Sequence, residues 1–184
     1  MRKSTIAIIA VAVIVIGYAA LAYNGLVSSS ESVDTQWAQV ETQYQRRIDL
    51  IPNLVNLVKG VMKQEQSVFN AIADARTRYA GASTASDKAQ AASEIESSYA
   101  RLLVVMENYP QLKSSDTVQT LMSQIEGTEN RVSVERSRYN DAVRSYNLMA
   151  KRFPSSLVAA AFGFQSKAYF QAAEGADAVP EVNL

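Results

Sequence analysis

Two kinds of hydrophobic pattern follow one another along the chain. Residues 5–22 read TIAIIAVAVIVIGYAALA, eighteen residues without a charge. As a helix rising ~1.5 Å per residue they cover roughly 27 Å, close to the thickness of the hydrocarbon core of a bilayer. From Val33 onward, apolar residues instead recur every three or four positions, the period of an amphipathic helix. The pattern predicts one membrane-spanning helix followed by amphipathic helices.

The amphipathic part divides into three long apolar stripes. We expect a break at residues 80–87 (AGASTASD), with Gly81 as a C-cap and Ser86 or Asp87 as the next N-cap. A second break is expected at residues 107–116, because the residue before Pro110 is disfavoured in a helix. Asp116 is expected to cap a third helix that closes before Pro154, and residues 155–164 form a short apolar helix or turn. The first stripe consists of Val33, Trp37, Val40, Tyr44, Ile48, Ile51, Val55, Val58 and Met62, and continues after a polar gap through Val68, Phe69, Ile72 and Tyr79.

These elements predict an all-α protein: an N-terminal transmembrane helix, then an elongated antiparallel bundle of three to four long helices. We expect a cytoplasmic N-terminus at residues 1–4 and the signal-anchor helix at residues 5–23. The bundle is expected at residues 24–164 and a C-terminal tail at residues 165–184. Pro52 lies inside the first stripe, RRIDLIPNLVNLV. The apolar phase is kept across it, which favours a kink in one long helix. A full break at Pro52, giving a four-helix up-and-down bundle, is the alternative.

Charges around the apolar run predict its orientation. Arg2 and Lys3 precede it, and the next basic residue is Arg46. Positive charge on one side predicts a cytoplasmic N-terminus, a single pass through the bacterial inner membrane, and a bundle on the periplasmic or extracellular side. The alternative is a signal peptide cleaved after the small residues Ala20 to Ala22, which would release a secreted binding module.

Composition removes several classes of chemistry. The chain has no cysteine and no histidine, which excludes disulfides, thiolate nucleophiles and the commonest general base. Eighteen basic residues balance eighteen acidic ones, so no net field attracts nucleic acid. We expect no nucleic-acid partner, no cofactor, no metal and no catalytic residues.

Several segments resemble the LemA family in order along the chain. They are YNGLV (23–27), WAQVETQYQRRIDLIPNLVNLVKG (37–60), ENYPQLKS (107–114), EGTENRVSVERSRYNDAVRSYN (126–147) and FPSSLVAAAFGF (153–164). The resemblance implies a membrane-anchored helical envelope protein, a scaffold rather than an enzyme, with a protein partner such as a membrane protease. We also expect homo-oligomerisation, through helix faces beyond the core-facing stripe and through the C-terminal apolar segment. One branch of the family is tied to magnetosome membrane formation. The family is described with an extracellular amino end, whereas the charges here predict the opposite. The neck SSSES (28–32) departs from the charged residues that relatives often carry.

The remaining polar residues are candidates for a buried network rather than a binding site. Glu126, Glu129 and Asn130 fall on one helical face, where they either pair with Arg46 and Arg47 or, as an alternative function with Glu107, hold a metal or perform acid–base chemistry. The network candidates are Arg46, Arg47, Asp49, Glu107, Asn108, Glu126, Glu129, Asn130, Arg131, Asn140 and Asn147. Asn147 repeats Asn140 at a spacing of seven and is interpreted as a buried amide that fixes register. Apolar residues near the C-terminus either cap the bundle or form an interface with a subunit, a partner or the membrane surface: Val158, Phe162, Phe164, Tyr169 and Phe170.

Overall fold

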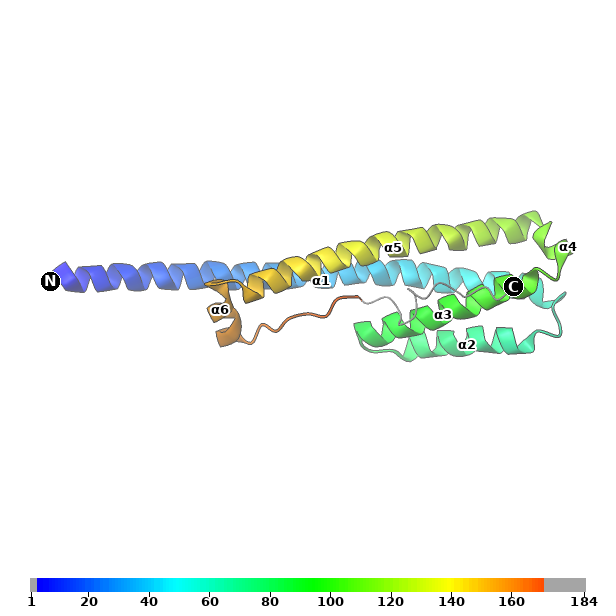
Figure 1. Ribbon diagram of the computed structural model, residues 1–184, viewed down its shortest axis with the longest axis horizontal. Coiled ribbons are helices and arrows are strands. Elements are labelled where there is room, and N and C mark those ends of the chain that lie inside the picture. The colour runs from blue at the N-terminus through cyan, green and yellow to red at the C-terminus, as the bar shows by residue number, and fades with distance from the viewer. Residues whose placement is uncertain (1–2, 171–184) are drawn as a thin grey trace, which may run out of the picture. The chain divides into compact units, whose positions relative to one another are not determined.

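The computed structural model describes residues 3–170 of the chain (Figure 1). Within this range every regular element is a helix, which confirms the all-α prediction and the long apolar helix at the N-terminal end. The expected tail lies outside the described residues from residue 171 onward, and the bundle arrangement stays a prediction. The helices are α1 (Lys3–Lys59), α2 (Gln66–Gly81), α3 (Ala85–Met106), α4 (Pro110–Lys113), α5 (Asp116–Lys151) and α6 (Ser155–Phe162).

The chain divides into two compact units. Among the described residues, the first unit consists of residues 3–38 and 137–169, and the second of residues 39–136 together with residue 170. Helices α1 and α5 therefore each contribute to both units. Each unit has buried apolar residues of its own, for example Leu26 and Val143 in the first and Ile95 and Ile125 in the second.

Helix α1 changes character along its length. Its eighteen-residue apolar window is 0% buried inside the protein, and Leu21 is still 74% exposed. Leu26 is the first fully buried side chain. This change is the one expected where a helix leaves a lipid environment and begins to pack against protein.

Most of the first predicted stripe is buried. Val33, Val40, Tyr44, Ile48, Ile51 and Val58 are each at most 6% exposed. Two positions in the part of the stripe up to Met62 differ from the prediction. Leu54 occupies the buried position instead of Val55, and Trp37 is half-buried, with its ring at 5.6 Å from that of Tyr139.

Helix α1 continues through Pro52. Proline has no N–H to donate to the carbonyl of Ile48, yet Ile51 just before it and Leu54 two residues after it are fully buried. Burial of this face explains why the helix is not broken here. The kink stays a prediction.

The structure contains a helix break that the sequence analysis did not predict, since it placed the first break at residues 80–87. Helix α1 ends at Lys59, and α2 begins only at Gln66. In the intervening turn, the N–H groups of Val61 and Met62 both donate to the Val58 carbonyl, at 3.0 and 2.9 Å. Met62 lies at the next position of the apolar period, and its side chain is fully buried within this turn. The hydrophobic pattern therefore continued where the helix did not.

The predicted break between α2 and α3 occurs, but with a different cap. Thr84, not Ser86 or Asp87, is the N-cap of α3: its hydroxyl oxygen accepts from the Asp87 N–H at 3.1 Å and donates to the Asp87 carboxylate at 2.7 Å. Gly81 is the last residue of α2, and Ala82 is its C-cap. The short connection leaves α2 and α3 as an antiparallel pair in the second unit (Figure 1).

The C-terminal elements follow the prediction closely. Helix α5 ends at Lys151, before Pro154, and the expected short apolar helix is α6. Asp116, expected to cap α5, is instead its first residue, one position after Ser115. Gly163 caps α6 with a left-handed backbone (φ 76°), which glycine adopts without a steric penalty. This cap lets the Phe164 N–H bond to the Ala159 carbonyl at 2.9 Å and turns the chain back along the first unit.

Candidate functional site

A charged cluster in the second unit, the Arg47 cluster, consists of Tyr44, Arg47, Glu96, Glu129 and Arg136. Arg47 of α1 is 3% exposed and donates to two carboxylates, Glu96 of α3 and Glu129 of α5, both at 3.1 Å. Arg136 of α5 also donates to Glu96, at 3.0 Å, and its Nε donates to the Tyr44 hydroxyl at 2.8 Å. The cluster therefore connects three helices through two arginines and two glutamates.

The charges of the cluster balance. Two guanidinium groups face two carboxylates, so no charge is buried alone, a condition that would be costly. Glu96 bridges both arginines with a single oxygen, Oε1. Arg136 also lies over the Phe170 ring, with Cζ at 4.5 Å from the centroid.

Burial also sets the ionisation of the tyrosines around this cluster. It raises the pKa of Tyr44 to about 12, against the opposing charge of Arg136. It raises the pKa of Tyr99 to about 12 as well, helped by the negative charge of Glu126. The pKa of Tyr79 is also raised by burial, and next by Glu41. These phenols stay neutral at physiological pH, and none has the lowered pKa of an activated nucleophile.

The structure places some of the predicted network residues in contacts and leaves others exposed. Arg47 and Glu129 lie in the Arg47 cluster, Asn147 is buried in the first unit, and Asn140 is half-buried. The helical phase places the other candidates outward, because a residue adjacent to a buried one is rotated by ~100° about the axis. Thus in EGTENR the buried residue is Thr128, whose hydroxyl donates to the Ile125 carbonyl at 2.6 Å. The exposed candidates are Arg46, Asp49, Glu107, Asn108, Glu126, Asn130 and Arg131.

Sequence reasoning missed Glu96 and Arg136. Both occupy positions on an apolar stripe: Glu96 precedes Tyr99 by three residues, and Arg136 lies between Val132 and Tyr139 at helical spacing. Arg47 stands in the same relation to Tyr44 and Ile51. A charged residue at a stripe position is the signal that would have found all three.

The first unit contains a second polar arrangement, the tail clamp. It consists of Tyr139, Tyr146 and Asn147 of α5, which bond to the backbone of the strap, defined here as residues 164–169. The Tyr139 and Tyr146 hydroxyls donate to the carbonyls of Ala168 and Gln165, at 3.2 and 2.9 Å. The Asn147 amide bonds to both backbone groups of Lys167, donating to the carbonyl and accepting from the N–H, each at 2.9 Å.

The side chain of Lys167 fastens the strap to α1. Its ammonium donates to the Asp34 carboxylate at 2.6 Å and to the Ser30 carbonyl at 3.1 Å. Burial raises the pKa of Tyr146 and of Tyr139, and Asp34 adds to each shift, so these phenols remain hydrogen-bond donors. Asn147 thus binds a peptide segment, whereas the sequence interpretation gave it a role in helix register.

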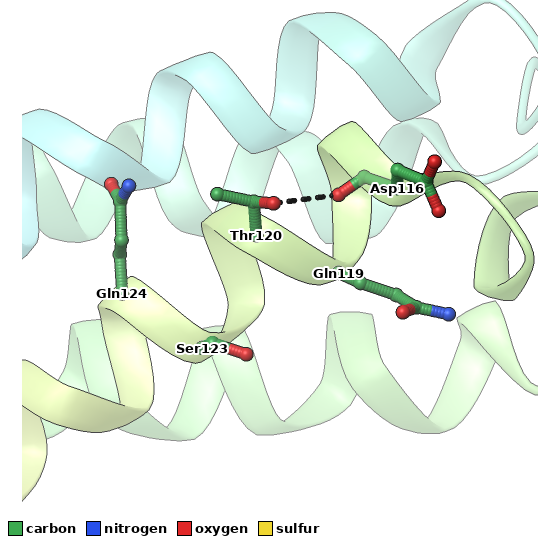
Figure 2. A pocket seen from close by; sticks show the side chains of 5 residues that line it. All are labelled: Asp116, Gln119, Thr120, Ser123 and Gln124. Atoms are coloured by element: carbon green, nitrogen blue, oxygen red, sulfur yellow. Dashed lines mark hydrogen bonds between the residues drawn. The ribbon is translucent and has the colours of Figure 1, made fainter.

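The carboxylates proposed for a metal or acid–base site do not converge. Glu129 binds Arg47, and Glu107 lies 3.7 Å from the Lys113 ammonium. Among residues 3–170, no group of three or more acidic side chains is arranged to hold a metal ion. Figure 2 shows a depression on α5 lined by Asp116, Gln119, Thr120, Ser123 and Gln124. All five come from one helix, and the Thr120 hydroxyl is engaged with the Asp116 carbonyl at 2.8 Å, so the depression offers no converging catalytic groups.

The predicted interface residues near the C-terminus have different surroundings. Val158 is buried, Phe164 and Phe170 are half-buried, and Phe162 and Tyr169 are 62% and 48% exposed. The structure adds Phe153 and Leu157, exposed to 81% and 64%, which the sequence analysis did not select.

Comparison with known proteins gives consistent matches. The sequence model of the LemA family matches residues 36–184. The chain is 27% identical over 175 residues to the magnetosome proteins MamQ 1 and MamQ 2 of Paramagnetospirillum magneticum, covering 81% of this chain and 64% of each relative. It is 24% identical over 174 residues to the magnetosome protein MamQ of Magnetospirillum gryphiswaldense, covering 80% of this chain and 64% of that protein. The chain thus spans a little under two thirds of the length of these relatives, and none of them is named as an enzyme.

Proposed function

Because this chain belongs to the LemA family, we propose that it is a membrane-tethered helical scaffold or adaptor protein of the bacterial envelope. It acts through self-association and protein partners and catalyses no reaction. The relatives are named as magnetosome proteins, and the proposal does not extend a magnetosome role to this chain.

The continuity of α1 is the observation that carries this proposal. One helix runs from the exposed apolar segment into the buried stripe that begins at Leu26. Because the helix continues without a break from the apolar segment to Leu26, it couples the position of the first unit to that of the membrane segment, as a tether requires. Arg2 and Lys3 before the segment support a cytoplasmic N-terminus, with the helices beyond it on the periplasmic or extracellular side of the inner membrane.

Self-association is supported by apolar side chains that the helices leave at the surface. Val104 of α3 is 66% exposed, Val134 of α5 is 49% exposed and Leu148 of α5 is 53% exposed. Such residues beyond the core-facing stripe suit helix–helix contact between copies or with another envelope protein.

Size-exclusion chromatography with light scattering, on the full chain in detergent, tests self-association. We expect a mass above that of one protein chain at micromolar concentration. Single cysteines at Val104, Val134 and Leu148 in this cysteine-free chain should form disulfide-linked dimers at one or more positions, whereas the exposed Ser123→Cys control should not. A strict monomer at all concentrations would contradict self-association, and crosslinking in membranes followed by mass spectrometry would then identify any hetero-partner.

Intact-mass spectrometry of the purified protein separates the anchor from a cleaved signal. The anchor predicts a mass that includes residues 1–22. A chain beginning at Tyr23 would instead favour the secreted binding module.

A further inference from the structure

Helix α6 exposes a small apolar surface in the first unit. The helix carries no charged residue (SSLVAAAF), and it buries Val158 and Ala159. Its other large side chains, Leu157 and Phe162, are 64% and 62% exposed, and Phe153 just before it is 81% exposed. Three large apolar side chains within ten residues thus face outward; we call them the α6 foot.

Contacts with α1 place the α6 foot beside the end of the apolar run. The Tyr23 ring lies 4.9 Å from that of Phe162 and 5.6 Å from that of Phe164, both edge-on. Tyr23 directly follows the uncharged segment that ends at Ala22. Figure 1 shows α6 against this part of α1. If residues 5–22 fill the hydrocarbon core, α6 lies at the depth of the bilayer interface, where tyrosine rings are favoured.

The charges near the α6 foot suit an anionic lipid surface. Between Asp141 and Glu174 the sequence contains no acidic residue, but it contains four basic ones. Two of these are paired, Arg144 with Asp141 at 3.2 Å and Lys167 with Asp34 at 2.6 Å. The other two, Lys151 and Arg152, are exposed immediately before Phe153.

The size of the surface argues against a second copy as its occupant. A large side chain buries at most ~150–250 Å², so three partly exposed ones offer a few hundred Å². A stable protein interface needs about 800 Å² per partner. Interfacial membrane binding has no such threshold, because the span already holds the protein at the bilayer.

We propose that the α6 foot (Phe153, Leu157 and Phe162) inserts into the headgroup–acyl boundary beside the α1 span, with Lys151 and Arg152 contacting anionic headgroups. This inference rests on the proposed membrane anchor. A second contact beside the span fixes the rotation of the first unit against the bilayer, which a single helix cannot do.

Tryptophan fluorescence of the full chain in vesicles tests the α6 foot. In a Trp37→Phe background, Leu157→Trp and Phe162→Trp would each report on one exposed position. The vesicles contain phosphatidylethanolamine and phosphatidylglycerol, with or without acyl chains brominated near the headgroup. We expect blue-shifted emission that bromine quenches by roughly half or more, as for a side chain buried ~5–10 Å below the headgroups. The exposed Val104→Trp control in the second unit should not be quenched.

An Ile14→Trp variant in the middle of the span separates the possible failures. It is measured in vesicles whose acyl chains are brominated near their terminal methyl groups, because bromine quenches only at short range. Quenching at Ile14→Trp without quenching at Leu157→Trp and Phe162→Trp would overturn the α6 foot and leave the anchor intact. Blue-shifted but unquenched emission at Leu157→Trp and Phe162→Trp would overturn the membrane contact of the α6 foot and indicate a protein contact instead. Absence of quenching at Ile14→Trp would overturn the anchor, and the α6 foot with it.

Discussion

The Arg47 cluster and the tail clamp hold their parts of the chain with different kinds of hydrogen bond. In the Arg47 cluster, charged side chains of α1, α3 and α5 bind one another. In the tail clamp, neutral side chains of α5 bind the backbone of the strap. The first arrangement needs a particular residue on each of three helices. The second needs particular residues on α5 only, because any strap residue presents the same peptide groups.

This difference has energetic and functional consequences. A buried charge that loses its partner is left unsolvated, so the cluster strongly favours one pairing of helices. The clamp bonds are neutral and bind a segment without helical structure of its own, so they open locally at lower cost. We therefore expect changes in the cluster to destabilise the second unit, and changes in the clamp to release the strap.

The largest effect is expected from Arg47→Met. This substitution removes the buried guanidinium that binds both carboxylates; Glu129, which is 60% exposed, becomes solvated, and Glu96 retains Arg136. We expect the free energy of unfolding to fall by about 3 kcal/mol, because two hydrogen bonds between charged groups are lost. Urea unfolding followed by circular dichroism measures it. The neighbouring exposed Arg46→Met is a matched control, for which we expect a change within about 0.5 kcal/mol. Equal effects at the two arginines would refute the special role of the cluster.

Alkaline pH provides a second way to weaken the cluster. Because burial raises the pKa of Tyr44 to about 12 in the folded state, the phenol ionises first in the unfolded state. Its contribution to stability is intact below pH 10 and is lost as the pH rises toward 12, by up to roughly 3 kcal/mol. Urea unfolding at several pH values should show a steeper loss of stability in the wild type than in Tyr44→Phe. Parallel pH profiles would contradict the raised pKa.

A smaller and more local effect is expected from Asn147→Ala. It removes both hydrogen bonds to the Lys167 backbone, worth about 1–2 kcal/mol together. Hydrogen exchange in residues 164–168 should therefore accelerate by a factor of roughly 5–30, with α3 unaffected. The exposed Asn108→Ala serves as the control. Faster exchange throughout α5 would mean that Asn147 supports the helix rather than the strap.

The smallest effect concerns the pair of Lys167 and Asp34. Asp34 is 62% exposed, so solvent screens the interaction, and a double-mutant cycle with Lys167→Gln and Asp34→Asn should give a coupling below about 1 kcal/mol. The coupling should shrink further in high salt. A larger coupling energy that does not change with salt would mean that this ion pair stabilises the protein as strongly as the ion pairs of the Arg47 cluster.

The helices of this chain were largely predictable from its sequence, because burial follows apolar period. The stripe from Val33 to Val58, the break near Gly81 and the end of α5 before Pro154 all follow from local rules. The turn after Lys59 could not be predicted from local rules. Met62 continues the apolar period through this turn, and Gly60 is the only turn-forming residue in it.

The polar clusters were less predictable because they depend on partners distant in the sequence. Arg47 and Glu129 were selected as candidates, but Glu96, the second carboxylate that Arg47 binds, and the second arginine, Arg136, were not. The tail clamp binds the strap through its backbone, so the side chains of the strap do not reveal these bonds. The seven-residue spacing from Asn140 suggested that Asn147 is buried. Only the structure identifies the backbone groups that Asn147 binds.

Cysteine labelling in intact cells tests the membrane tether most directly, since the chain contains no native cysteine. Single cysteines would replace Ser4 before the apolar run, Ile14 within it and Ser28 beyond it. With a membrane-impermeant maleimide, we predict labelling of Ser28→Cys in intact cells, labelling of Ser4→Cys only after permeabilisation, and none of Ile14→Cys. Labelling of Ser4→Cys and Ser28→Cys from the same side would contradict a transmembrane anchor.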